Sequence, residues 1–348
     1  MAKGTTLYTK VNLRSESSYG TGTAGEVQSQ SRQMAVGPTG IVTYGMEWDL
    51  GADRTIGIRN PIVQGSQTLT AVNPTISLES PAVPTDELPF YFAMLQEPTS
   101  SVDNDWTRTW TWELGSETTS LPPVSMQAIV SDGNVPFFVN GIALTSLELS
   151  AQSSGTTALS ASGFAKFVSS YEVSPATVGF PSISPRAIAG RVWTARLWDQ
   201  FPHSVPETSG TAFEHLYDWN LSITPGNAQI NAQVGDVYAA GINPYGAPFS
   251  GTLSMTVAST PDTNGWLNNR GGNIFVELQY NDAGDPSHSV NLWLAGIISN
   301  IEPLSGDQDG IVTHAVEIAL AFDPATGKTL DVVVTNQLAD LNGTPESD

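Results

Sequence analysis

The chain has 348 residues, 40% of them hydrophobic, which suffices for two packed domains and excludes a disordered chain. It contains no cysteine, so disulfides and thiolate metal sites are excluded. Its 13 basic and 34 acidic residues give a net charge of −21, and a chain so poor in lysine and arginine cannot hold nucleic-acid phosphates by releasing counterions.

The first 40 residues are rich in glycine, serine and threonine and show no apolar periodicity. This composition predicts an extended N-terminal arm. The start lacks the apolar run of a signal peptide, and no stretch of about 18 apolar residues occurs anywhere in the chain. We therefore expect a soluble intracellular product that makes no contact with a membrane.

Short patterns from the first half of the chain return in the second half. The sequence MEWDL at 46–50 resembles YDWNL at 217–221, and TISL at 75–78 resembles TLSM at 252–255. Gly141-Ile142 returns later as Gly296-Ile297. Because the order of these patterns is the same while their spacing drifts, they predict a duplicated domain with loops of different length.

Alternating apolar and polar residues predict half-buried strands in both copies. The polar positions of the first pattern are Glu47 and Asp49, and its counterpart has Asp218 on the equivalent face. The strand that starts at residue 75 leaves Glu79 on its polar face, and the strand over 252–257 follows the same alternation.

One segment has the features of a helix. Residues 85–95 offer Thr85 as an N-cap, acidic residues in the first turn and an apolar stripe at helical spacing. The stripe consists of Leu88, Tyr91, Phe92 and Leu95. A weaker counterpart in the second copy covers residues 261–270.

Four further strands are expected in each half. They cover 106–114, 124–130, 141–149 and 157–164 in the first copy, and 273–280, 290–295, 296–301 and 311–322 in the second. Each unit then has about six strands and one short flanking helix. This arrangement predicts a mainly β protein made of two tandem β-sandwich domains.

Composition shifts predict the boundaries of these domains. We expect an extended arm over 1–40, a first β-sandwich over 41–168, a proline-containing linker over 169–190, a second β-sandwich over 191–335 and a polar tail over 336–348.

No motif for catalysis or cofactor binding is present. The chain has no Gly-x-Ser-x-Gly, no His-Glu-x-x-His and no phosphate-binding glycine loop after a strand, and its four histidines are scattered. The acidic segments 282–285 and 307–310 lack the glutamate that completes a calcium loop, so turn formation explains them. We therefore predict that the protein is not an enzyme and has no catalytic residue, cofactor or metal.

An aromatic segment keeps one alternative open. Trp106, Trp110 and Trp112 form a platform on which sugars stack, with Asp103 and Asp105 as nearby acids, or else they belong to a buried strand. The first reading predicts a carbohydrate-binding or glycan-active β-sandwich protein, and the second predicts core packing.

Several segments together resemble one protein family. The glycine-rich start with Glu16 and Tyr19-Gly20, the sequence DELPFYFAML at 86–95 and the sequence WTRTWTW at 106–112 are similar to the major tail tube proteins of long, non-contractile-tailed bacteriophages. The similarity extends over most of the chain and is clearest in residues 1–170.

The resemblance implies a β-sandwich with a flanking helix, six copies of which form a ring. Stacked rings make the hollow tube through which DNA passes without specific binding. With two units per chain, three chains would complete a pseudo-hexameric ring. The resemblance also implies contacts with other tail proteins at the tube ends, assembly in the host cytoplasm and a final location in the virion tail.

A passage for DNA needs a wall with few lysines and arginines, because a negative wall does not hold phosphates. The polar faces of the predicted strands supply Glu47, Asp49, Glu79 and Asp218 as candidate lumen-facing residues. Each of them is equally compatible with a position on the outer, solvent-facing side.

Overall fold

The computed structural model describes residues 10–36, 42–49, 68–104, 107–116, 121–131, 136–170, 187–198, 211–213, 215–230, 236–260, 273–282, 284–285, 287–308 and 310–343. Of these described residues, 61% are in strands and 8% in helices, so the prediction of a mainly β protein is confirmed. Within the described residues, one large sheet joins seventeen strands, and two short hairpins stand apart from it.

Seven antiparallel strands form one continuous layer of this sheet, which we call the seven-strand layer. In spatial order they are β5 (Thr75–Ser80), β10 (Ala158–Phe164), β9 (Pro136–Gln152), β14 (Leu216–Thr224), β17 (Ser250–Ala258), β20 (Ile311–Leu320) and β19 (Ser289–Gln308). The central pairing of β9 with β14 joins the first half of the chain to the second.

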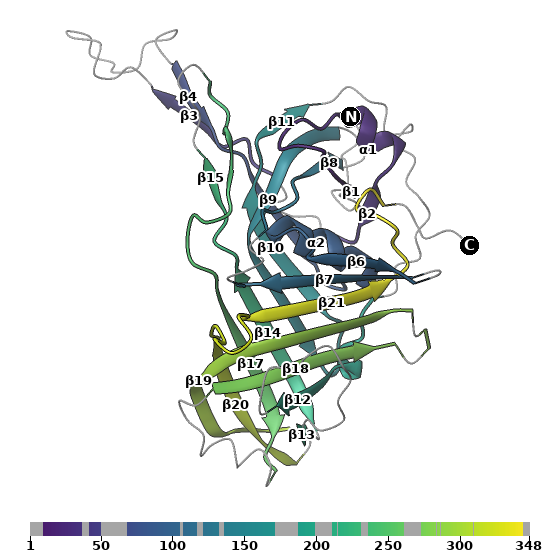
Figure 1. Cartoon of the computed structure of the whole chain (residues 1–348), viewed down its shortest axis with the longest axis vertical. Coiled ribbons are helices and arrows are strands. Elements are labelled where there is room, and N and C mark those ends of the chain that lie inside the picture. The colour runs from purple at the N-terminus through teal and green to yellow at the C-terminus, as the bar shows by residue number, and fades with distance from the viewer. Residues whose placement is uncertain are drawn as a thin grey trace, which may run out of the picture.

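Two groups of strands lie on the other side of the core. The first group contains β1 (Lys10–Ser15), β2 (Arg32–Met34), β8 (Met126–Ser131), the start of β9 and β11 (Phe167–Ser170). The second contains β12 (Thr194–Trp198), β13 (Thr211–Ala212), β18 (Asn273–Asn281), the start of β19, β21 (Leu330–Asn336), β7 (Arg108–Leu114) and β6 (Ser100–Asp103). In Figure 1, strands β7, β21 and β18 run across the strands of the seven-strand layer.

β9 and β19 belong to both layers, and each changes layer at a glycine. Gly141 has φ 65°, and a side-chain carbon added there would lie 2.6 Å from Cβ of Lys166. A carbon added at Gly296 would lie 2.4 Å from Cγ2 of Ile318. The two strands expected over 290–295 and 296–301 are therefore a single bent strand, because this glycine bends β19 without ending it.

The predicted helix is present, but its surroundings differ from the prediction. A 3-10 turn, η2 (Thr85–Glu87), precedes α2 (Leu88–Leu95), and every residue of α2 is buried. A helix that is apolar all round belongs inside a core, so the expectation of a flanking helix was wrong. The weaker counterpart over 261–270 lies outside the described residues.

The N-terminal segment also differs from the expected extended arm. β1 pairs with both β2 and β8, and the short helix α1 (Ala24–Ser29) packs on β8. Val11, Asn12 and Leu13 are all fully buried. The sequence of β1 does alternate, with Val11 and Leu13 between polar residues, but the alternation is short and stands in a segment rich in glycine, serine and threonine.

The first sequence repeat does not occupy equivalent places. β3 (Met46–Asp49) forms a separate hairpin with β4 (Thr68–Val72), whereas Trp219 lies in the seven-strand layer. The place beside β5 is taken by Val42 and not by β3. Val42 forms an isolated antiparallel bridge with Ile76, in the way that Leu221 pairs with Leu253. Alternation of this kind is common to all half-buried strands, so the similarity of MEWDL and YDWNL was misleading.

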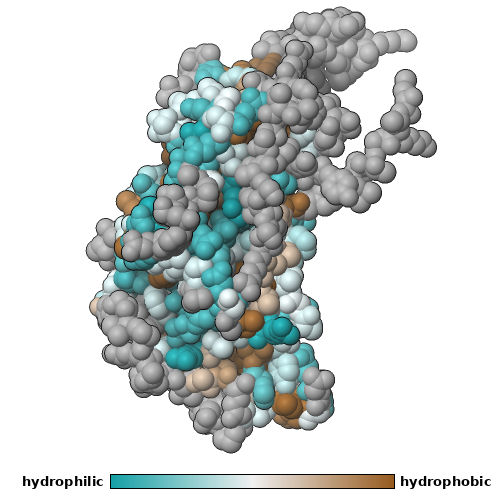
Figure 2. All heavy atoms as spheres, turned by 90° about the vertical axis from the view of Figure 1, so that its right-hand side faces the viewer, coloured by the Kyte–Doolittle hydropathy of each residue, from teal (hydrophilic) through white to brown (hydrophobic). Residues whose placement is uncertain are grey.

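Other connections complete the fold. β15 (Ala228–Ile230) and β16 (Gly241–Asn243) form the second hairpin, and the 3-10 turn η4 (Gly190–Val192) leads into β12. Residues 171–186 of the expected linker lie outside the described ranges, while Ile188 is fully buried. One hydrophobic core runs through both halves. On the side seen in Figure 2, hydrophobic residues reach the described surface only in small separate patches.

Replacing Gly141 by alanine should destabilise the fold by about 1–3 kcal/mol, because a side chain is strained at positive φ and has no room beside Lys166. Chemical denaturation measures the free energy of unfolding. Gly155→Ala is the control, since an added carbon there lies 3.8 Å from its nearest neighbour. Equal losses in the two variants would contradict the role given to the bend.

Candidate functional site

The most extensive feature without a role in the core is the polar face of the seven-strand layer. Residues of one face alternate with buried ones along each strand: Ile76 and Leu78 are buried while Glu79 is exposed. Cross-strand pairing aligns the polar residues in rows, such as Glu79 with Ser160, Ser160 with Glu148 and Glu148 with Ser222. Pairing residues of an antiparallel sheet point to the same side, so these rows form one continuous surface.

This polar face is acidic and lacks cations. The acidic side chains on it are Glu79, Glu148, Asp218, Glu302 and Glu317. None of the seven described strands contains a lysine or an arginine. The remaining polar positions are mostly serine, threonine and asparagine, so the surface is hydrophilic and negative.

The structure places the four sequence candidates unequally. Glu79 and Asp218 share the polar face of the seven-strand layer. Glu47 is exposed on the separate β3–β4 hairpin, where its carboxylate accepts a hydrogen bond from Asn73. The side chain of Asp49 lies outside the described residues.

Sequence reasoning missed three acids of this face, Glu148, Glu302 and Glu317. The signal for Glu148 and Glu317 was available, because each alternates with buried leucine, valine or isoleucine in a predicted strand. What the sequence does not contain is the register that places these acids on the same face as Asp218. Asp218 pairs with Thr256, Thr256 with Ala315, and Ala315 with Glu302.

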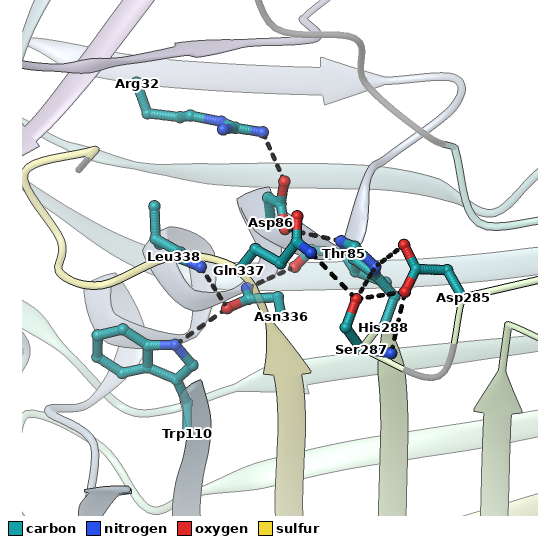
Figure 3. Close-up of polar contacts among 10 residues, drawn as sticks. All are labelled: Arg32, Thr85, Asp86, Trp110, Asp285, Ser287, His288, Asn336, Gln337 and Leu338. Atoms are coloured by element: carbon teal, nitrogen blue, oxygen red, sulfur yellow. Dashed lines mark hydrogen bonds and ion pairs between the residues drawn. The ribbon is translucent and has the colours of Figure 1, made fainter. Parts of the chain in front are cut away.

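A second feature is the polar network where the two halves meet (Figure 3). Arg32, the first residue of β2, contacts the carboxylate of Asp86 in η2 at 3.0 Å. His288, in the turn before β19, contacts the same carboxylate at 3.4 Å. Nδ1 of His288 also lies 3.2 Å from Asp285. These contacts tie three segments that are distant in the sequence to one carboxylate.

A neutral part of the network lies next to these charges. Trp110 donates its indole N–H to Asn336, and Asn336 donates its side-chain amide to the carbonyl of Thr85. The backbone N–H of Leu338 closes the cluster on the same asparagine oxygen. Asn336 is the last residue of β21, and Trp110 belongs to β7. Because β21 of the second half pairs with β7 of the first, the network stabilises a second place where the halves join, besides the pairing of β9 with β14.

The charges shift the pKa values in this network. The hydrogen bond to Asp86 raises the pKa of His288 above its ordinary value, despite partial burial. Burial opposes ionisation of Asp86, but hydrogen bonding to His288 and the charges of Arg32 and His288 outweigh it and lower the pKa of that carboxyl. His288 lies between the carboxylates of Asp86 and Asp285, which favour its protonated form, and this is a structural ion-pair arrangement.

Glu87, next to Asp86, behaves in the opposite way. Burial raises its pKa to about 8, so the carboxyl is protonated at neutral pH. One oxygen accepts the backbone N–H of Ala35 at 2.8 Å. The Glu87 carboxyl therefore holds the segment after β2 by this hydrogen bond. It lies in the protein interior, where no substrate reaches it.

The tryptophans proposed as a sugar platform lie in the core. Trp110 and Trp112 are 4% and 0% exposed, and the indole of Trp112 donates to the carbonyl of Gln96. Trp106 and Asp105 lie outside the described residues. The core-packing interpretation therefore holds for the two described tryptophans.

Other kinds of site were sought in the described part of the chain. It contains no group of three or more histidine, aspartate or glutamate side chains arranged to hold a metal ion. None of its helices is long and apolar enough to cross a membrane. A cavity of about 450 Å³ is lined by Leu95, Asn227, Tyr245 and Phe249, but it contains no ionisable carboxylate, histidine or lysine.

Comparison with known proteins gives no family assignment. No family model matches the chain, and no curated protein matches it.

Protein stability should fall as the pH rises from about 4.5 to about 8, because over this range the native state keeps a proton on Glu87 that the unfolded chain has released. Glu87→Gln should make this fall shallower, leaving the part due to His288. Denaturant unfolding at a series of pH values measures it. The exposed Glu97→Gln is the control, and identical profiles for Glu87→Gln and the parent protein would contradict the assignment.

Proposed function

We propose that the protein is a structural subunit of a hollow tube, a tail tube protein of a long, non-contractile bacteriophage tail. Each chain contributes two related units, and three chains close a pseudo-hexameric ring. Rings stack into a tube that carries DNA and meets other tail proteins at its ends. In this proposal the subunit assembles in the host cytoplasm and functions in the virion without enzymatic activity or cofactor.

The observation that carries the proposal is the pairing of β9 with β14. Leu149 pairs with Leu221 and Ala151 with Trp219, so a strand of the first half and a strand of the second half are neighbours in one sheet. Adjacent units in a tube wall need this kind of joint, because it leaves no unpaired strand edge between them.

The strand order of the two halves supports a duplicated unit. In one group β1, β8, β9 and β11 are neighbours, and in the other β12, β18, β19 and β21 are neighbours in the same order. In the seven-strand layer, β9–β10–β5 corresponds to β19–β20–β17. Both series change layer at a glycine, Gly141 or Gly296.

A head-to-tail joint that occurs once within a chain can also occur between chains. The seven-strand layer ends at β5, with the Val42 bridge, on one side and at β19 on the other. Repeating the β9–β14 joint between those ends gives a heterologous interface, which closes into a ring when the rotation permits. Two units per chain then make three chains the natural number for a sixfold arrangement.

The charge of the polar face fits the passage of DNA. Five carboxylates without lysine or arginine repel phosphates and offer nothing to release condensed counterions. We therefore assign this face to the lumen, with Glu79 and Asp218 from the initial candidates and Glu148, Glu302 and Glu317 in addition. Glu47 is assigned away from this face.

The alternative, a carbohydrate-binding or glycan-active protein, has less support. Its platform depended on Trp110 and Trp112, whose rings lie in the core. Electron microscopy of the concentrated protein separates the two hypotheses. Rings or tubes with threefold symmetry are expected for a tail tube subunit, whereas only discrete particles at every concentration would overturn the proposal.

Reversing charge on the assigned lumen face should make the assembled protein bind DNA. We expect Glu79→Lys with Glu317→Lys to give tubes that bind duplex DNA with a dissociation constant on the order of 10⁻⁴ to 10⁻⁶ M and a steep salt dependence. The fold should be unaffected, because both residues are exposed. Filter binding or co-sedimentation at several salt concentrations measures the effect.

The matched control carries the same charge change away from that face. Glu97→Lys with Asp103→Lys alters two exposed residues at and before β6. DNA that is threaded through the assembled tube should be retarded by Glu79→Lys with Glu317→Lys and not by this control. Equal DNA binding by both variants would show that the face with Glu79 does not line the channel.

A further inference from the structure

The last part of β19 is an open sheet edge. Beyond Ile297 this strand pairs with β20 on one side, and no described residue pairs with its other side. Ser299, Asn300 and residues 302–308 are exposed. A row of unpaired backbone groups of this length is a template for another strand.

Within the chain, the equivalent edge of β9 is already occupied by β14. β9 and β19 can be aligned by their pairing with β10 and β20. In each strand one residue after the glycine is left out of the pairing, and then Leu147 pairs with Ala161 as Ile301 pairs with Val316. Ile301 and Glu302 of β19 therefore correspond to Leu147 and Glu148 of β9, two of the residues that pair with β14.

β19 is deformed at the place where β9 is regular. Its register with β20 breaks between Glu302 and Gly306, so Pro303, Leu304 and Ser305 form a bulge. Leu304 has φ 58° and is the one described residue other than glycine with positive φ. Its side chain is 71% exposed, so no packing compensates for the strained backbone.

Two contacts from β20 hold the bulge in place. The backbone N–H of Leu304 donates to Nδ1 of His314 at 3.2 Å, and the hydroxyl of Ser305 donates to the carbonyl of Thr313 at 3.3 Å. In the first half, the residue that corresponds to His314 is Leu159, which pairs in register with Leu149. The unit with a paired edge thus lacks both the bulge and the histidine.

We propose that the edge of β19 receives the segment around Val42 of a second copy of the chain, and that the bulge at 303–305 blocks this pairing until assembly. Proline at an edge removes a donor, and a bulge turns the edge away from a partner strand, which are two known ways to protect open edges. The inference rests on the proposed tube function and adds its control step.

The occupant follows from the joint inside the chain. Val42 pairs with Ile76 as Leu221 pairs with Leu253, and Leu221 is the residue that faces Leu149 of β9. The same register between chains places Thr43 opposite Glu302, as Ser222 lies opposite Glu148. Both Thr43 and Glu302 are exposed in the single chain.

A first experiment tests the docking register with cysteines, in a chain that has none of its own. Thr43→Cys with Glu302→Cys should give covalent trimers under mild oxidation, detected on non-reducing gels. Each single substitution can give dimers at most and is the control. If the parent protein forms rings but the double variant yields no covalent trimer, the proposed register is wrong. If no condition produces rings at all, the proposed function itself fails.

A second experiment tests the bulge. Pro303→Leu, Leu304→Ser, Ser305→Ala and His314→Leu together replace the bulge residues by those that follow Glu148 in β9, and the histidine by the leucine of β10 that pairs there. Sedimentation velocity should show this variant associating at a protein concentration at least tenfold lower than the parent. Leu304→Gly should act in the opposite direction, because glycine accepts positive φ and stabilises the bulge. Unchanged association in Leu304→Gly and in a folded fourfold variant would overturn the blocking role.

Discussion

The structure depends on one constraint: every strand of the seven-strand layer needs a hydrogen-bonded neighbour on both sides. Unpaired backbone donors and acceptors at a sheet edge are a liability, and the chain removes two edges from the middle of this layer by joining β9 to β14. Of the two edges that remain, at β5 and at β19, the edge at β19 carries a bulge. The proposed assembly follows from this distribution of paired and unpaired edges.

Glycine and buried polar groups make these joints possible. Gly141 and Gly296 allow two long strands to bend from one layer into the other, so that each strand contributes to both sides of the core. Where the halves meet, Asp86 gathers a positive arginine and a histidine from two distant segments. A buried ion pair adds little net stability, because taking its charges out of water costs about as much as their attraction returns, but the His288–Asp86 contact does join a residue of each half.

Strands with one buried and one polar face could be predicted from sequence, because their alternation is local. β5, β10 and β20 were expected close to their observed bounds for this reason. β1 was missed although Val11 and Leu13 alternate with polar residues, because the alternation is short and lies in a segment rich in glycine, serine and threonine. α2 was found by its apolar spacing, but its complete burial depends on strands contributed by distant parts of the chain.

The acidic face could be predicted only in part. Glu79 and Asp218 were identified from alternation, whereas Glu47 has the same pattern and lies on a separate hairpin. Register between strands decides which polar residues share a surface, and register arises from long-range pairing that no local pattern encodes. The bulge at Leu304 belongs to the same class, since only its pairing with β20 reveals it.

The claim that the sheet continues from one chain to the next is tested most directly by amide hydrogen exchange on free and assembled protein. In the free chain, β9 residues 147–152 should already be protected by β14, while β19 residues 299–306 should exchange quickly on their open side. On assembly, protection should rise at β19 and at residues 42–45, and remain unchanged at β9. Assembled protein in which the β19 amides exchange as quickly as in the free chain would contradict the account.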